Sequence, residues 1–149
     1  MSIILRKPEK KDLEWLCEEF KIFSKYYNTK KSLYHSDEYT KDLILNISKN
    51  HIFTLAEDTE KGLMGWIVAL AAPHLFNPDI KTTTLVSWWV SEEHRKSRVG
   101  YLLLKNLIKI AKENSDWFIV TVNVDSPVKK ESLKNLGFSL VENQYLMEV

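Results

Sequence analysis

The stretch from Leu85 to Ala111 carries the clearest chemistry in this sequence. An apolar run, 85–90, leads into a polar segment and then into an apolar helical run. The polar segment ends in Arg95-Lys96-Ser97-Arg98-Val99-Gly100. A helix start offers backbone N–H groups without intrahelical partners, and the helix dipole adds partial positive charge there. Three cations and a small residue at such a point predict a cradle for a phosphate or pyrophosphate. The alternative is that these cations are ordinary surface residues before a helix.

The loop resembles the phosphate loop of the GNAT acetyltransferase superfamily, which reads Gln/Arg-x-x-Gly-x-Gly/Ala. Arg95, Val99 and Gly100 match that pattern, whereas Arg98 stands where the family usually has its first glycine. A Cβ at this position is compatible with right-handed helical backbone angles. The Arg98 guanidinium is then expected to offer phosphate a charge-assisted contact.

Two flanking segments extend the resemblance. The sequence Val-Ser-Glu-Glu-His-Arg at 90–95 resembles the family's Val-x-Pro-Glu-Tyr-Arg approach to the loop. The sequence Asn-Leu-Gly-Phe at 135–138 resembles the Leu-Gly-Phe that ends the family's last helix. The resemblance therefore covers the C-terminal half by motif and the N-terminal half by pattern alone.

Length and composition bound the class of protein. The 149 residues are 44% hydrophobic and 28% charged, which predicts one globular domain over 1–149. Lys and Arg number 21 against 20 Asp and Glu, so no strong field favours nucleic acid as a partner. The single Cys17 excludes an internal disulfide, and no signal peptide or long apolar span is visible, so we expect a cytoplasmic protein with no membrane partner.

The N-terminal half predicts a short strand at 3–5 and two helices. Pro8 opens the first helix, whose apolar stripe places Cys17 in the core rather than at a reactive site. Ser36 is the expected N-cap of the second helix. In the family this region caps the acceptor site; the alternative is that its tyrosines simply pack with their hydroxyls toward water. These tyrosines are Tyr26, Tyr27, Tyr34 and Tyr39.

Three strands linked by hairpins are expected next, at 51–57, 63–71 and 81–90. Gly62 suits the positive φ of the first turn, and Gly65 marks a bulge or a close backbone approach.

The C-terminal half predicts a helix over 98–114 and a parallel strand over 117–122. Ser126 then caps a helix that runs to Leu136. The segments 138–140 and 144–149 supply closing strands. The predicted class is α/β (α+β): a GNAT-like mixed, mostly antiparallel sheet of about seven strands with helices on both faces.

The resemblance implies acetyl-CoA as co-substrate, in direct acetyl transfer to an amine. By that analogy, the N–H of Val90 polarises the thioester carbonyl in an oxyanion-hole role. The loop binds the pyrophosphate, and Asn123 hydrogen-bonds the pantetheine arm. The implied cofactor-binding residues are Trp88, Trp89, Val90, Arg95, Lys96, Ser97, Arg98, Val99, Gly100, Tyr101 and Asn123.

The proton-transfer groups stay open at this stage. The family's usual tyrosine falls at Leu133 and its asparagine at Ser126, so the thiolate's acid is left among Tyr101, Ser126 and Tyr145. The catalytic candidates are thus Val90, Ser126 and Tyr145. The bases for the amine that position alone suggests are Glu57, His51, His74 and Asp125, or a water relay. The histidines lack ligand spacing, so no metal is expected.

The functional hypothesis is an N-acetyltransferase that acts on a primary amine of a small molecule, peptide or protein. A catalytically inactive GNAT-fold domain that binds CoA is the first rival, motivated by positions 98 and 133. A cofactor-free protein-interaction domain is the second. Exposed strand edges near the C-terminus are compatible with a homodimer.

Overall fold

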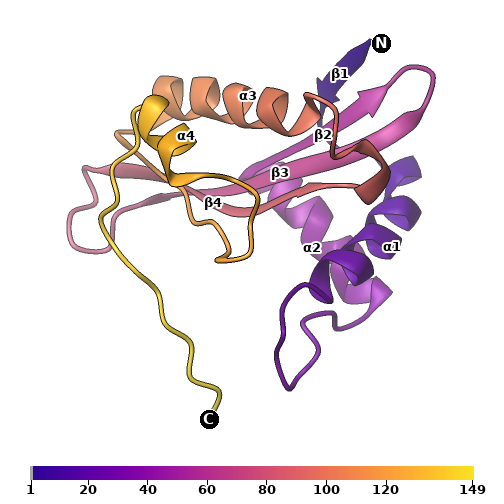
Figure 1. Ribbon diagram of the computed structural model, residues 1–149, viewed down its shortest axis with the longest axis horizontal. Helices are drawn as coiled ribbons and strands as arrows, with labels where there is room; N and C mark the ends of the chain where they lie inside the picture. Colours follow the sequence, from indigo (N-terminus) through magenta and orange to yellow (C-terminus); the bar gives the residue numbers. More distant parts are fainter. Residues whose placement is uncertain (1) are drawn as a thin grey trace.

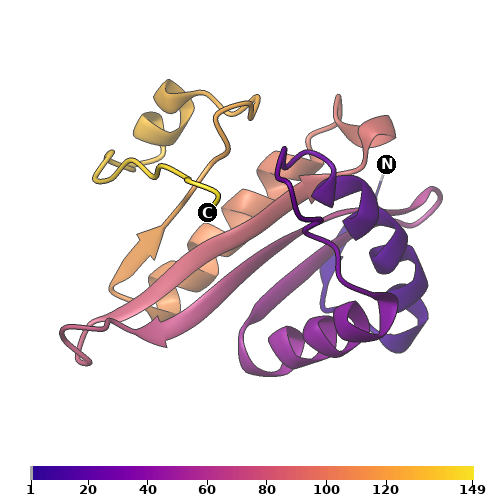
Figure 2. The same ribbon diagram turned by 90° about the horizontal axis from the view of Figure 1, so that it is seen from below.

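A five-stranded sheet forms the centre of the protein, in the order β1-β2-β3-β4-β5 (Figures 1 and 2). The computed structural model describes residues 2–149. The strands are β1 (Ile3–Arg6), β2 (Ile52–Asp58), β3 (Gly62–Pro73), β4 (Lys81–Val90) and β5 (Trp117–Ile119). The first four pair antiparallel, and β4 pairs parallel with β5. The mixed sheet is confirmed, with five strands in place of the predicted seven.

Helices cover both faces of this sheet, as predicted. In Figure 1, α3 (Val99–Asn114) lies along one face, and α1 (Leu13–Ser24) and α2 (Asp37–Asn50) lie on the other. Side chains alternate between the two faces along a strand. Accordingly Trp66 packs with α1 and α2, whereas Ile67 packs with α3, and both side chains are fully buried. The mixed α/β class is therefore confirmed.

The first helix begins later than Pro8 predicts. A 3-10 turn, η1 (Lys10–Asp12), comes first, and α1 starts at Leu13. Asp12 causes this delay, because its carboxylate accepts from the backbone N–H of Glu9 at 2.7 Å and closes a capping box. Ser36 caps α2 as predicted, accepting from the N–H of Tyr39.

A buried ion network ties β1 to the start of α1. Asp12 is 3% exposed and forms a fork with Arg6, at 2.8 and 2.9 Å. Arg6 also donates to Glu57 on β2 at 2.7 Å. The Arg6 guanidinium, helped by the Glu9 amide, holds the pKa of Asp12 below its ordinary value of 3.8, and burial opposes this only in part.

Two glycines set the hairpin between β2 and β3, as the sequence predicts. Gly62 has φ +86° in the turn, where Asp58 accepts from the N–H groups of Glu60 and Lys61. Gly65 lies opposite the register shift between Ala56 and Glu57. A Cβ atom added at position 65 would lie 2.3 Å from the carbonyl oxygen of Trp89. Strand β4 therefore packs against β3 more closely than any side chain at position 65 allows.

The C-terminal part differs most from the prediction. β5 ends at Ile119 rather than 122, because its pairing with β4 stops at Thr84. The last helix, α4 (Lys130–Asn135), is capped by Lys129 and not by Ser126. The Ser126 hydroxyl instead accepts from the N–H of Val128, which closes a local turn before the helix.

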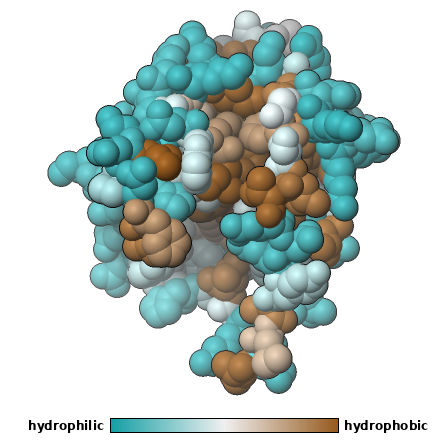
Figure 3. All heavy atoms as spheres, turned by 90° about the vertical axis from the view of Figure 1, so that its left-hand side faces the viewer, coloured by the Kyte–Doolittle hydropathy of each residue, from teal (hydrophilic) through white to brown (hydrophobic). Residues whose placement is uncertain are grey.

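The segments 138–140 and 144–149 form no strand, so the two predicted closing strands are wrong. Phe138 packs on Phe118, but the chain beyond it is exposed and its backbone pairs with no strand of the described residues. In Figure 3 this tail projects at the bottom, while apolar side chains gather at the centre of the same face and polar ones surround them. Near the end of the tail, the Glu148 side chain accepts from the N–H of Lys30 at 2.8 Å.

Among residues 2–149, no helix is both long and apolar enough to span a bilayer.

Acid should unfold the protein partly through Asp12. Because its folded pKa is lowered, its contribution to stability is complete above the unfolded value near 3.8 and is lost as the pH falls through the folded value. We expect Asp12→Asn to lower the free energy of unfolding by about 2 kcal/mol at pH 7. This difference in stability between the variant and the parent protein should shrink below pH ~4. Urea unfolding at a series of pH values measures this. The exposed Asp42→Asn is the control, and an unchanged deficit at low pH would contradict the assignment.

Gly65→Ala should be severely destabilising, because its Cβ would meet backbone atoms of β4 that cannot rotate away. We expect a loss of about 3 kcal/mol in the free energy of unfolding. Gly62→Ala is the matched control. Its Cβ meets nothing within 4 Å, so the substitution introduces only the strain of an alanine at positive φ, which lowers the free energy of unfolding by about 1 kcal/mol. Equal losses in the two variants, measured by denaturant unfolding, would contradict the close approach.

Candidate functional site

Strand β4 loses one of its neighbours halfway along its length. Its register with β3 shifts between Val68 and Ala69, where Val86 is the extra residue opposite them. A bulge bends its strand and increases the local twist. β5 pairs only with residues 82–84, before this bulge, and Figure 2 shows it turning away from β4. Beyond Thr84, β4 therefore has one paired edge and one open edge.

The backbone groups of Trp88 and Val90 point to that open edge. The N–H of Ser91 donates to the carbonyl of Met64 at 2.9 Å, and hydrogen-bonded and non-hydrogen-bonded residue pairs alternate in an antiparallel ladder. In the observed register, Trp89 and Trp66 are consequently joined by backbone hydrogen bonds. Val90 and Gly65 face each other without such bonds. The N–H of Val90 is thus directed away from β3.

The open edge of β4 is followed by a 3-10 turn, η2 (Glu92–His94), and then by the start of α3. The first hydrogen bond of this helix runs from the N–H of Leu102 to the carbonyl of Arg98, at 3.0 Å. Within residues 2–149 the N–H groups of Lys96, Arg98, Gly100 and Tyr101 have no acceptor. Val99 reaches only the Ser97 hydroxyl, at 3.4 Å. This turn is a cluster of donors that suits an anion.

The side chains of Lys96 and Arg98 stand exposed beside these donors. Neither forms a hydrogen bond or an ion pair with any residue from 2 to 149. Arg98 has φ −81° and ψ 3°, so its Cβ causes no backbone strain where the family pattern has glycine. Both cations remain available to a bound anion.

Arg95 is engaged elsewhere. Its Nε donates to the carbonyl of Val90 at 3.1 Å, and its guanidinium lies over the rings of Trp89, at 4.5 Å, and Tyr26, at 5.1 Å. The structure therefore separates the Arg95 side chain from the other two cations and attaches it to the end of β4. The sequence pattern placed all three together, because spacing cannot give a side chain's direction.

The two tryptophans lie on opposite faces of β4, as strand alternation predicts. Trp88 packs with α3: an ideal Cβ on Gly100 would lie 3.8 Å from its indole Nε1 and 3.4 Å from Val90. Trp89 is 6% exposed on the α1 face, where its Nε1 donates to Glu19 at 2.8 Å. The small residue at 100 thus brings the helix start against the end of β4.

A cluster that sequence reasoning missed surrounds Trp89. Tyr26 stacks edge-on at 5.1 Å between ring centroids, and its hydroxyl donates to Glu92 at 2.7 Å and contacts Arg95 at 3.3 Å. The sequence offered one signal, the tyrosines of 26–39, but the acidic partners on α1 and η2 have no motif. Tyr26 is 50% exposed, yet its hydroxyl does not simply face water, whereas the hydroxyls of Tyr27 and Tyr39 have no hydrogen-bond partner within residues 2–149.

A cavity of about 200 Å³ lies on the α1 and α2 side of the sheet. Only Thr40 and Ser87 are polar among its lining residues, and Ser87 accepts from Trp66 Nε1 at 2.8 Å. Val86, the bulge residue, forms part of the wall. The apolar cavity therefore opens next to the part of β4 that β5 has left.

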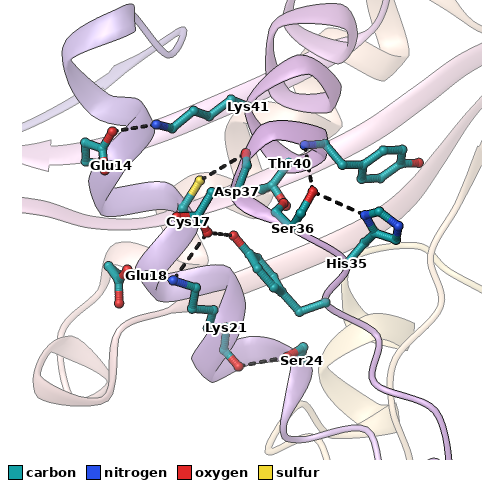
Figure 4. Close-up of polar contacts among 12 residues, drawn as sticks. Glu14, Cys17, Glu18, Lys21, Ser24, His35, Ser36, Asp37, Thr40 and Lys41 are labelled. Carbon is teal, nitrogen blue, oxygen red and sulfur yellow. Dashed lines mark hydrogen bonds and ion pairs between the residues drawn. The ribbon is translucent and has the colours of Figure 1, made fainter.

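The loop between α1 and α2 is held by the contacts in Figure 4. Asp37 accepts from the Tyr34 hydroxyl and pairs with Lys21 at 3.3 Å. Burial and the Asp37 carboxylate raise the pKa of Tyr34 to about 12. Cys17 is buried, donates to the carbonyl of Asp37 at 3.8 Å and has its pKa raised by burial. The core role predicted for Cys17 agrees with this.

The predicted proton donors lie in three separate segments: the C-terminal tail, the loop before α4 and the first turn of α3. Tyr145 is 93% exposed on the tail and has no hydrogen bond within residues 2–149. Asn123 accepts from the N–H of Asp125, in the same loop as the Ser126 turn. Tyr101 lies in the first turn of α3 with Lys105 over its ring at 5.6 Å.

Three of the four base candidates accept hydrogen bonds from their local surroundings. Glu57 accepts from Arg6, whereas Asp125 contributes its backbone N–H, and not its carboxylate, to the turn with Asn123. His51 accepts from the N–H of Ala71 on β3. Ala71 lies six residues along this strand from Gly65, which corresponds to roughly 20 Å. His74 lies farther along, accepting from Phe76. Neither histidine is beside Val90.

The fold is shared with known enzymes. An acetyltransferase from Trypanosoma brucei superposes with a TM-score of 0.77 at 15% identity, over 99% of this chain and 100% of that one. A ribosomal-protein-alanine N-acetyltransferase from Brucella melitensis gives 0.76 at 9%, over 100% and 99%. Glucosamine-6-phosphate N-acetyltransferase from Arabidopsis thaliana gives 0.72 at 14%, over 99% of both chains. At these identities the likeness concerns the fold alone.

The sequence gives an independent indication. No curated protein sequence matches the chain. The profile of the Acetyltransferase (GNAT) family, however, matches residues 13–138, which include all three main helices, β2 to β5 and α4. The chain therefore belongs to the Acetyltransferase (GNAT) family.

Proposed function

We propose that this protein is an acetyl-CoA-dependent N-acetyltransferase that acts on a primary amine. One observation carries the proposal: the open edge of β4 leads to a turn in which four backbone N–H groups, those of Lys96, Arg98, Gly100 and Tyr101, have no acceptor within residues 2–149. An extended ligand with a diphosphate at one end and hydrogen-bonding amides along its length, such as CoA, suits free backbone groups on the strand edge and at the helix start.

The diphosphate end belongs at the start of α3. The N–H groups of Arg98, Gly100 and Tyr101 supply donors, and the helix dipole adds positive potential there. Lys96 and Arg98 add mobile cations at the rim. Ser97 keeps the turn compact, because its hydroxyl donates to the carbonyl of His94 at 2.6 Å.

The thioester end belongs beside Val90. A free N–H directed into the gap between β4 and β5 can donate to the thioester oxygen and stabilise the negative charge that develops as the amine nitrogen attacks the carbonyl carbon. The C–S bond then breaks, and the thiolate takes up a proton. Trp88, Val99 and Gly100 pack around this point and fix the strand against the helix.

The acceptor belongs on the α1 face, where the apolar cavity and the Tyr26–Trp89 pair lie. Two of the similar structures are N-acetyltransferases of amines by name, which supports an amine here. With His51 and His74 remote and Glu57 bound to Arg6, a water relay is the proton route we propose for the ammonium. A cytoplasmic setting, with acetyl-CoA at hand, accompanies this proposal.

A second candidate is a catalytically inactive domain that binds CoA. The observation that favours it is the lack of a placed acid: Leu133 occupies the family's usual tyrosine position, and Tyr145 is exposed. Release of free thiol from acetyl-CoA across a broad panel of amines separates the two. Binding of CoA without thiol release from any amine would favour the inactive domain.

Charge reversal at the helix start tests the pyrophosphate site. We expect Lys96→Glu with Arg98→Glu to weaken CoA at least about tenfold in isothermal titration calorimetry, because two charge-assisted contacts become repulsive. Lys109→Glu with Lys112→Glu changes the same charge on the same helix away from its start and is the control. CoA affinity equal in the two double variants would remove the basis of the proposed function.

Arg95→Lys tests the separate place of Arg95. Lysine keeps the charge but cannot stack as a planar group over Trp89 while bonding to Val90. We expect Tm to fall by about 2–4 °C and kcat to drop, with KM for acetyl-CoA changed by less than about threefold. If Arg95 instead holds phosphate, KM would rise and kcat would be kept.

A further inference from the structure

An acidic groove lies between α1 and the turn that follows β4. Its volume is about 250 Å³, and its lining residues are Glu19, Ile22, Ser91, Glu92 and Glu93. Three of these five side chains are carboxylates, and none is a lysine or an arginine. The lining therefore carries an excess of negative charge, although the chain as a whole is nearly neutral.

Ser91 gives an independent sign of a ligand. The residue is 3% exposed, and its hydroxyl has no hydrogen-bond partner within residues 2–149 although it borders the groove. Its backbone is fixed, since its N–H donates to Met64 on β3. A buried hydroxyl without a partner is costly, and a bound donor or acceptor relieves that cost.

The carboxylates are partly prepared for a cation. Glu19 accepts from Trp89 Nε1 with one oxygen, and Glu92 accepts from the Tyr26 hydroxyl with one oxygen. In each case the second oxygen has no partner among the described residues. Glu93 lies 3.5 Å from the ring of His94, measured from Oε1 to Nε2. Two side chains are thus held in place by neutral donors and keep acceptor capacity for a positive group.

The groove is adjacent to the proposed reaction site. Ser91 follows Val90 directly, and Glu92 connects through Tyr26 to Arg95, which bonds to the Val90 carbonyl. No group of three or more metal-ligating side chains converges among residues 2–149. The carboxylates are therefore spread along the groove, an arrangement that suits an organic ammonium with several N–H donors better than a bare ion.

We propose that this groove binds a second cationic nitrogen of the acceptor, so that the preferred substrate is a diamine or another dicationic amine. The inference rests on the proposed function, because it assigns the acceptor class of the same site. The remote ammonium is held by Glu19, Glu92 and Glu93 and donates to the Ser91 hydroxyl, while the other amine is presented to the thioester.

Calorimetry with the CoA-saturated protein tests binding without catalysis. The probes are putrescine, cadaverine and hexamethylenediamine, each compared with the monoamine of equal chain length. We expect at least one diamine to bind tenfold or more tightly than its monoamine, and the Glu19→Gln, Glu92→Gln, Glu93→Gln triple variant to abolish that preference. Glutamine keeps the oxygens that accept from Trp89 and Tyr26.

The matched control neutralises three exposed carboxylates elsewhere: Glu113→Gln, Glu131→Gln and Glu142→Gln. It changes net charge equally, so a general electrostatic effect would affect both triple variants alike. Ser91→Ala adds a second measurement. Removal of an unpaired buried hydroxyl should leave Tm equal or higher, while diamine affinity falls about tenfold. A loss of Tm with unchanged diamine affinity would mean that Ser91 has a structural role only.

The outcomes distinguish a failure of the diamine proposal from a failure of the proposed acetyltransferase function. If thiol release from acetyl-CoA occurs but no diamine is preferred over its monoamine in binding or in kcat/KM, the diamine proposal is wrong and the acetyltransferase stands. If diamines bind through the three glutamates but no amine yields thiol release, the groove is a cation site and the proposed reaction is wrong. Tighter binding of Mg²⁺ than of every diamine would also overturn the proposal.

Discussion

The structure depends on the loss of strand pairing along one edge of β4. A strand in the middle of a sheet normally has both rows of backbone groups occupied, and an edge strand exposes one row to water. β4 is a central strand up to Thr84 and an edge strand after Val86. The bulge and the short β5 leave backbone groups of β4 without partners in the sheet, at the point where α3 supplies further free donors; the proposed function assigns these groups to CoA.

Close packing maintains this arrangement. Gly65 lets β3 approach the carbonyl of Trp89, Gly100 lets α3 approach Val90, and Arg95 bonds to the carbonyl of Val90. Three contacts thus hold the end of β4 while the N–H of Val90 stays free. A free amide is useful in catalysis only when its direction is fixed, because reorganisation during the reaction would cancel its electrostatic benefit.

Sequence reasoning predicted the parts whose physics is local. The strands at β2, β3 and β4, the Ser36 cap and the turn at Gly62 follow from periodicity, capping and φ preferences within a few residues. The features that sequence reasoning did not predict depend on distant partners. Segments 138–140 and 144–149 have strand-like composition but no neighbour to pair with, and Arg95 turns toward Trp89 and Tyr26, which no local pattern encodes. The acidic groove was invisible for the same reason, since Glu19 and Glu92 are 73 residues apart.

The stacked indoles have an optical consequence. Trp66 and Trp89 lie 6.2 Å apart between ring centroids in one buried cluster, a guanidinium rests on the second of them, and Trp88 lies against the first turn of α3. Indole emission responds to nearby charge and to solvent. β4 consequently carries an intrinsic fluorophore on each face, Trp88 toward α3 and Trp89 toward α1. With the other three tryptophans replaced, changes on the two sides can be followed without any label.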